Sequence, residues 1–244
     1  MFDIIKDSVE SYTKNAGLIL FFSIPFIISL VLLLPPFSPA PVFSALGGYF
    51  LRSGSIPEMT NFDLLIITIS SGLSLLFISL AAVAVTLVVK STKTRTKVST
   101  EAMKNLGKYT IQVFMIFIVF KILEVIILSY VVSTGANELP VFIFSFLFSL
   151  GLFYIAPAVV LEERKPVPAI ISSFKHILRR PVNLLVWLVI AFILLYISAS
   201  LSFMMFSDPM LRQGFIILIN SLFILPFLVV LQAHLYISKY TIIK

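Results

Sequence analysis

Six long apolar runs constrain this chain of 244 residues more than any other feature. Each run is close to the roughly 20 residues that an α-helix needs to cross the hydrocarbon core of a bilayer. In lipid only helices and closed barrels satisfy every backbone amide, and none of the runs alternates like a barrel strand. The sequence therefore predicts an all-α integral membrane protein with six transmembrane helices. The six runs are Leu18–Leu34, Leu64–Val89, Thr110–Val132, Pro140–Leu161, Val182–Phe206 and Phe215–Ile237.

Composition supports this class and argues against several kinds of activity. The chain is 59% hydrophobic and 12% charged, whereas soluble domains carry about 25% charged residues. It contains no Cys, so disulfides and thiolate metal sites are excluded. Nucleophile-elbow, zinc-protease, P-loop and dinucleotide-binding motifs are all missing from the sequence. We therefore expect a protein that is not an enzyme and that uses no cofactor and no metal ion.

Positive charge is distributed unevenly between the two sides of the predicted membrane domain. Only Arg52 and Arg212 fall on one side, and Lys121 lies inside a run. Basic residues are retained on the cytoplasmic side during insertion, so both termini are predicted to be cytoplasmic. The net charge of +7 then suits anionic head groups rather than nucleic acid. The other side carries Lys6, Lys14, Lys90, Lys93, Arg95, Lys97, Lys104, Lys108, Arg164, Lys165, Lys175, Arg179, Arg180, Lys239 and Lys244.

A basic amphipathic segment precedes each pair of runs. The three segments are Phe2–Asn15, Lys97–Tyr109 and Pro168–Arg180, with apolar residues spaced three and four apart as on one face of a helix. The pattern predicts one membrane domain, 1–244, built from three parallel repeats at 2–90, 97–162 and 166–240. Each repeat would be an interfacial helix followed by a two-helix hairpin. The residues expected to face lipid head groups are Lys14, Lys108, Arg179 and Arg180.

Lys121 and Glu124 are the most unusual residues of the predicted spans. Lys121 falls near the middle of the third run, where a charge costs about 2.5–3.5 kcal/mol on insertion scales. The two residues are three apart and share a helix face. Either they neutralise each other inside the bundle, or they form a proton or ion relay or a counter-charge for a bound head group.

Four more polar residues are expected near the cytoplasmic ends of the spans: Gln112, Asn183, Gln232 and His234. They can make hydrogen bonds between helices or line a polar cavity that opens to the cytoplasm. His176, in the third amphipathic segment, is expected to face the head groups.

Prolines mark two further features. Pro25, Pro157 and Pro226 lie within the first, fourth and sixth runs, where each frees a backbone carbonyl and favours a kink. Between the first two runs, the apolar stretch Val42–Leu51 is flanked by prolines and can be a surface helix or a re-entrant segment.

One stretch resembles a known group of membrane domains. It reads Tyr154-Ile-Ala-Pro-Ala-Val-Val-Leu-Glu-Glu and continues with Pro168-Ala-Ile-Ile-Ser-Ser-Phe-Lys. Over Phe153–Leu195 it is similar to six-span prokaryotic domains such as the membrane part attached to some glycerophosphodiester phosphodiesterases. The resemblance implies an accessory or lipid-facing module of a prokaryotic cytoplasmic membrane. It carries over no catalytic residue, because the 244 residues hold no phosphodiesterase domain.

Two functions follow as hypotheses. The first is a non-enzymatic multi-pass module that binds membrane lipids, a partner membrane protein or a second copy of itself. The alternative is a small-solute or ion transporter or channel that uses Lys121 and Glu124. A continuous polar path through the bundle would favour transport, and a dry interior would favour the module.

Overall fold

The computed structural model of the chain is entirely helical in the residues it describes, which are 2–32, 61–94, 98–134 and 139–238. The predicted segment Val42–Leu51 lies outside these residues. The helices are α1 (Phe2–Lys14), α2 (Ala16–Leu32), α4 (Asn61–Thr94), α5 (Val98–Thr134), α6 (Leu139–Leu152), α7 (Ile155–Leu161), α8 (Pro166–Arg179), α9 (Pro181–Met205), α10 (Pro209–Ile219), the π-helix η1 (Asn220–Ile224) and α11 (Leu225–Ile237).

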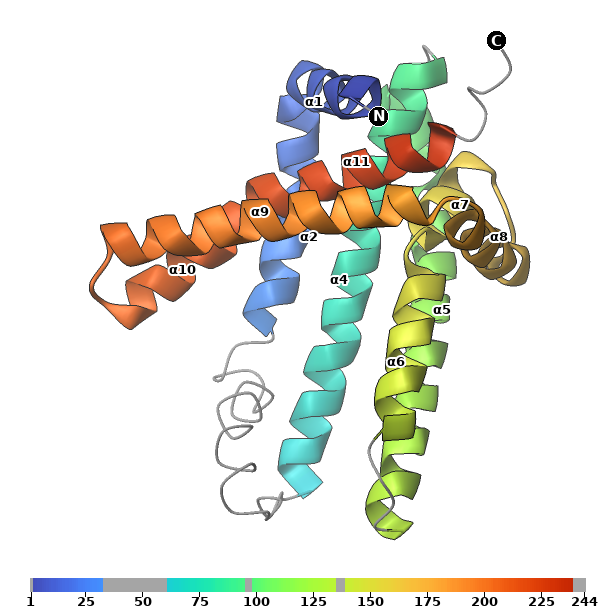
Figure 1. Ribbon diagram of the computed structural model, residues 1–244, viewed down its shortest axis with the longest axis vertical. Helices are drawn as coiled ribbons and strands as arrows, with labels where there is room; N and C mark the ends of the chain where they lie inside the picture. Colours follow the sequence, from blue (N-terminus) through green and yellow to red (C-terminus); the bar gives the residue numbers. More distant parts are fainter. Residues whose placement is uncertain (1, 33–60, 95–97, 135–138, 239–244) are drawn as a thin grey trace.

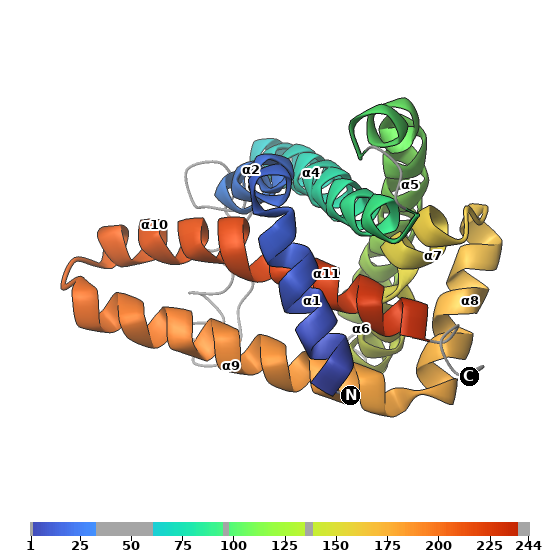
Figure 2. The same cartoon turned by 90° about the horizontal axis from the view of Figure 1, so that it is seen from above.

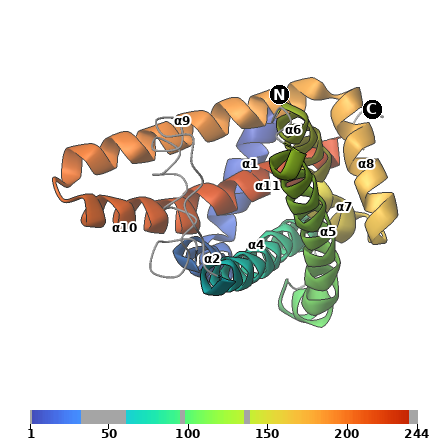
Figure 3. The same cartoon turned by 90° about the horizontal axis from the view of Figure 1, so that it is seen from below.

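The helices form two groups that run in different directions. Helices α2, α4, α5 and α6 run side by side, whereas α9 and the continuous α10, η1 and α11 form a hairpin that lies across them (Figures 1 and 2). Seen from below, α4 and α5 are viewed nearly along their axes while the hairpin lies in the plane of the picture (Figure 3). The third hairpin therefore differs in direction from the first two.

Four helical segments of the described chain are long and apolar enough to cross a membrane. Their number rises to five if α1 and α2, which meet at 90°, form one bent span. These segments support a multi-pass membrane protein. The six-span arrangement in three repeats stays a prediction. The four segments are Thr68–Thr92, Lys104–Glu124, Pro181–Met205 and Pro209–Ile237.

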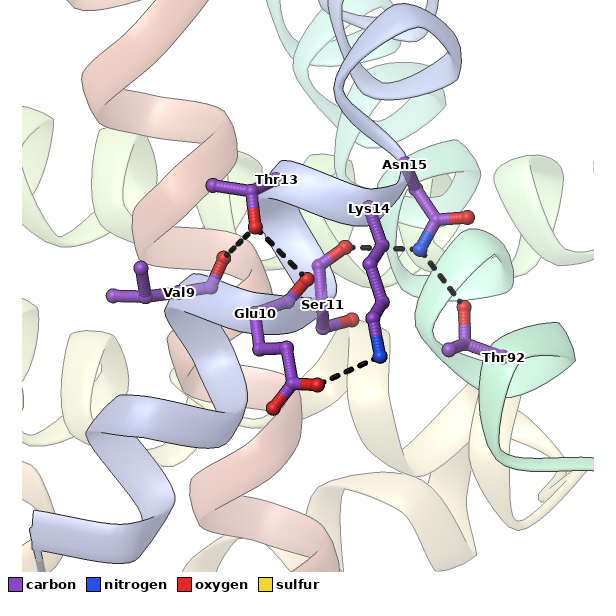
Figure 4. A network of polar contacts seen from close by, with 7 residues as sticks. All are labelled: Val9, Glu10, Ser11, Thr13, Lys14, Asn15 and Thr92. Atoms are coloured by element: carbon purple, nitrogen blue, oxygen red, sulfur yellow. Dashed lines mark hydrogen bonds and ion pairs between the residues drawn. The ribbon is translucent and has the colours of Figure 1, made fainter.

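The first amphipathic segment is a separate helix, as predicted. Helix α1 ends at Lys14, and the side-chain amide of Asn15 donates to the Ser11 carbonyl at 2.9 Å. The same amide donates to Thr92 Oγ1 of α4 at 3.2 Å, which fixes the turn against the end of a long helix (Figure 4). Asn15 thus ties the sharp bend before α2 to its neighbour.

The other two amphipathic segments behave differently from each other. The third is a separate helix, α8, because Pro181 begins α9 and cannot donate a backbone hydrogen bond. The second was expected to be an interfacial helix of its own, but α5 continues without a break from Val98 to Thr134. No proline lies within Val98–Thr134, so nothing interrupts the helical hydrogen bonds after Tyr109.

The fourth apolar run, predicted as one span, is divided into α6 and α7. Pro157 has no N–H to offer the carbonyl of Phe153 four residues earlier. The side chain of Gln232 in α11 donates to that carbonyl instead. The backbone N–H of Tyr154 donates to Ser173 Oγ of α8 at 3.0 Å. Polar side chains from two other helices therefore satisfy the break.

Pro226 has a similar consequence near the start of α11. It cannot donate to the carbonyl of Leu222, which lies in the π-helical turn η1. The Tyr12 hydroxyl of α1 donates to this carbonyl at 3.3 Å. Helix α1 is thus joined to α11 at a point where the helical hydrogen bonds are interrupted.

The core lies where α4, α7 and α11 meet. The stretch of α4 from Ala81 to Val89 is buried, and Tyr154 and Tyr236 are fully buried beside it. Small residues let α2 and α4 approach closely, and the Ser29 and Ser74 hydroxyls are 2.8 Å apart. Ser74 therefore faces the neighbouring helix in the bundle.

Candidate functional site

A polar cleft of about 400 Å³ lies beside α8. We call it the basic cleft. The turn after α7 supplies one wall and α8 supplies the floor and the other wall. Its lining residues are Glu162, Arg164, Ile171, Ser172, Lys175, His176, Arg179 and Arg180.

The floor of the basic cleft is a fixed polar cluster. Ser172 and His176 are 8% and 5% exposed. The Ser172 hydroxyl lies 2.8 Å from the Tyr236 hydroxyl and donates to Glu162 Oε2 at 3.2 Å. The His176 ring contacts the rings of Tyr154 and Tyr236, with centroids 4.6 and 5.0 Å apart. Contacts from α6–α7 and α11 therefore hold this face of α8 in place.

The walls of the cleft carry an excess of positive charge. Glu162 is paired with Arg164 through the guanidinium Nε and Oε2. Lys175 and Arg179 are exposed at the opening, and Arg180 is half-buried. The Arg180 guanidinium donates to the Ser238 carbonyl at 3.1 Å, and this partner carries no charge. With His176 neutral, the lining residues carry a net charge of three positive units.

A second ion pair anchors the turn that forms the cleft wall. Lys90 Nζ of α4 lies 2.7 Å from Glu163 Oε1, and Glu163 has a positive φ of 53°. The hydrogen bond and charge of Lys90 hold the pKa of Glu163 below its ordinary value. The turn is therefore fixed to α4 in a backbone conformation that non-glycine residues adopt infrequently.

The outer surface of α1 forms a smaller polar pocket of about 200 Å³. Lys14 Nζ contacts Glu10 Oε1 at 2.6 Å (Figure 4). This contact lowers the pKa of Glu10. The lining residues are Asp7, Glu10, Ser11, Lys14, Thr92 and His234. Carboxylates offset the lysine here, so this pocket has no excess of positive charge.

Lys121 and Glu124 form an ion pair on α5, with Nζ and Oε2 2.8 Å apart. The pair lines a lateral groove of about 580 Å³ between α4, α5 and α6. Most of the other lining residues are apolar, including Phe117, Phe120 and Phe144. The two charges thus face each other in an apolar groove.

The remaining predicted polar residues are not gathered in one cavity. Asn183 donates to the Leu235 carbonyl at 3.4 Å, and His234 Nδ1 lies 3.0 Å from the Val230 carbonyl. Gln232 bonds the Phe153 carbonyl, as described above. Gln112 has a buried Oε1 that makes no hydrogen bond within the described chain. Three of the four residues therefore bond backbone carbonyls of the helices.

The predicted head-group residues lie in two places. Arg179 and Arg180 line the basic cleft, whereas Lys14 and Lys108 are exposed outside it. Lys108 Nζ lies 6.0 Å from the centre of the Tyr109 ring. His176 was expected to face the head groups. It lines the floor of the basic cleft, with its ring nearly buried against Tyr154 and Tyr236, and contact with a head group stays a prediction.

Sequence reasoning did not assign Glu162, Arg164, Ser172 or Lys175 to a site. A signal was present in α8, since Ser172, Lys175, His176 and Arg179 follow at intervals of three, one and three. This spacing places them on one helix face. Among the described residues, no group of three or more His, Cys, Asp or Glu side chains could hold a metal ion.

Comparisons with protein families, curated proteins and solved structures gave no match. The resemblance of Phe153–Leu195 to prokaryotic six-span domains therefore stays a prediction.

Proposed function

We propose that the protein is a non-enzymatic multi-pass membrane module that binds anionic lipid at its basic cleft. The observation that carries this proposal is the basic cleft, whose lining residues have an excess of three positive charges around a buried polar floor. Basic side chains near a membrane surface attract anionic lipid, each contributing about 1 kcal/mol. Lipid is favoured over a protein partner because the binding groups are charges rather than an interlocking apolar surface.

We further propose how the module lies in a prokaryotic cytoplasmic membrane. In this proposal the six apolar runs span the bilayer, which requires the α9 hairpin to stand beside α2, α4, α5 and α6 rather than across them as in Figure 1. Both termini are then cytoplasmic, and the basic cleft faces the cytoplasmic leaflet. Support comes from the side preference of Lys and Arg. Further support comes from the α9 hairpin, which exposes large apolar residues such as Phe192, Tyr196 and Phe203. Lipid contact would cover that surface if the hairpin stands in the bilayer.

Native mass spectrometry of the full chain tests lipid selectivity. The purified protein is titrated with dioleoyl phosphatidylglycerol and, separately, with dioleoyl phosphatidylcholine. The proposal expects phosphatidylglycerol to bind several-fold more tightly. Equal binding of the two lipids would contradict it.

A second candidate function is favoured by the Lys121–Glu124 pair, because it lines the 580 Å³ groove rather than a sealed interior. A transporter or channel could use the pair to pass a small solute or ion. Proteoliposomes loaded with a pH-sensitive or ion-sensitive dye test this function. Flux that is present for the natural chain and lost in Lys121→Leu would support it, and flux equal to that of empty liposomes would oppose it.

A further inference from the structure

We infer that the basic cleft binds a phosphomonoester head group, the group that distinguishes phosphatidic acid from phosphodiester lipids. This inference rests on the proposed function and gives it a defined ligand. It combines the charge of the cleft, its donors and the apolar surface beside it.

The charge of the cleft suits a ligand that carries more than one negative charge. Glu162 would repel an anion, but Arg164 is paired with it and compensates its charge. Within the described part of the chain, Lys175, Arg179 and Arg180 of this lining form no ion pair with a carboxylate. A phosphomonoester has a second pKa near about 6 and carries between one and two negative charges at neutral pH. A phosphodiester carries one, so it would leave more of this positive charge unbalanced.

The donors match the shape of the ligand as well as its charge. A phosphomonoester has three strong acceptor oxygens. Arg179 and Arg180 offer planar guanidinium groups, which bind phosphate in a bidentate manner, and Lys175 adds a compact ammonium. The volume of about 400 Å³ lies within the range of small-ligand sites.

The surface beside the cleft indicates a lipid rather than a soluble phosphate. Val167, Ile171 and Leu178 lie on one face of α8 and are 67%, 61% and 79% exposed. Helical spacing places this apolar face directly beside the face that carries Lys175 and Arg179. Ile171 also lines the cleft itself. An acyl chain can therefore lie along the apolar face while the head group occupies the cleft.

Native mass spectrometry measures the binding of dioleoyl phosphatidic acid and dioleoyl phosphatidylglycerol to the full chain. The pH is about 7.5, above the second pKa of a phosphomonoester, so that most of this group carries its second negative charge. Loss of two charge-assisted contacts is expected to weaken phosphatidic acid binding by roughly tenfold or more in Lys175→Gln/Arg179→Gln. In this double variant the preference for phosphatidic acid over phosphatidylglycerol should disappear. The matched control is Lys6→Gln/Lys104→Gln, which removes two exposed charges outside the cleft and should keep the preference.

Two further measurements distinguish a lipid head group from a soluble phosphate ester and identify variants that do not fold. Ile171→Ser should weaken phosphatidic acid binding and leave binding of soluble glycerol 3-phosphate unchanged. Circular dichroism and gel filtration identify variants that fold, and Lys175→Arg, which retains the charge, should keep the preference for phosphatidic acid.

Three results would overturn the inference. The first is equal binding of the two anionic lipids by the natural chain, which leaves the proposed anionic-lipid function intact if both bind better than phosphatidylcholine. The second is an unchanged preference in the cleft variant. The third is glycerol 3-phosphate binding as tightly as the lipid, which would assign the cleft to a soluble ligand.

Discussion

The side-chain amide of Gln232 donates a hydrogen bond to the backbone carbonyl of Phe153. This carbonyl has no helical donor because Pro157 stands four residues later. The contact joins α11 to the junction of α6 and α7, next to the Tyr154 ring that contacts His176 in the floor of the basic cleft. A side chain from the end of the sequence thus stabilises a break that shapes the cleft.

Replacing Gln232 by Met should destabilise the fold by about 1–3 kcal/mol, because the Phe153 carbonyl is left without a donor. Thermal unfolding in detergent, followed by circular dichroism, measures this effect. Gln213→Met is the control, since Gln213 is exposed on α10 and should tolerate the change.

The same contact predicts a coupling with Pro157. In Pro157→Ala the new backbone N–H can bond the Phe153 carbonyl, so the additional loss from Gln232→Met should become smaller. Strictly additive effects of the two substitutions would show that Gln232 does not act through this carbonyl.

Gly151 of α6 is predicted to be needed for close packing against α8. A Cβ at this position would collide with the Phe174 ring, whereas one at Gly107 has open space. Gly151→Ala should lose about 1–3 kcal/mol through overpacking. Gly107→Ala should be neutral or stabilising by up to about 1 kcal/mol. Equal unfolding temperatures for the two variants would contradict the packing shown here.

Lys121 and Glu124 should show strong coupling when they are replaced. Glu124→Leu leaves a lysine charge in an apolar groove and should cost about 2–3 kcal/mol. Replacing both residues by Leu should cost less than this single change, because no unpaired charge remains. Unfolding of the two single variants and the double variant in detergent provides the test. A double variant that is as unstable as the sum of the singles would exclude mutual neutralisation.

Acid should weaken the attachment of the turn after α7. Lys90 lowers the pKa of Glu163 from its ordinary value of 4.5. The pair therefore adds stability above that ordinary value and loses it as the pH falls through the lowered pKa. Because Glu163 is largely exposed, the contribution is at most about 1 kcal/mol.

Unfolding measured between about pH 3 and pH 7, a range around the ordinary carboxyl pKa, should show this loss. Glu163→Gln should flatten it, and so should Lys90→Met. An unchanged acid dependence in both variants would refute the role of the pair.

The absence of Cys makes membrane topology directly measurable. Ser207→Cys places a thiol in the exposed turn between α9 and α10, and Lys165→Cys places one in the turn before α8. With six spans, an impermeant maleimide added to intact cells labels the Ser207→Cys variant, and the Lys165→Cys variant reacts only after permeabilisation. Labelling of both variants from the same side would contradict six spans.

Local patterns in the sequence predicted where helices form, but they did not predict which residues of different helices contact each other. The three- and four-residue spacing of apolar residues identified α1, and the prolines marked the interruption at Pro157. The partner of the freed carbonyl could not be predicted, because Gln232 lies 79 residues from Phe153. Likewise, α8 has an amphipathic pattern that leaves open which side faces protein. Ser172 and His176 are buried and Ile171 is exposed because Tyr154, just before α7, and Tyr236 of α11 contact the polar face of α8.

Selection of anionic lipid at the basic cleft is tested most directly in the native membrane. The protein is extracted with surrounding membrane into polymer nanodiscs, and the bound lipids are compared with the bulk membrane. We predict anionic lipid enriched several-fold, with the enrichment falling as salt is raised because exposed charges are screened beyond about 10 Å at 0.1 M salt. A lipid composition equal to that of the bulk membrane at low salt would contradict the claim.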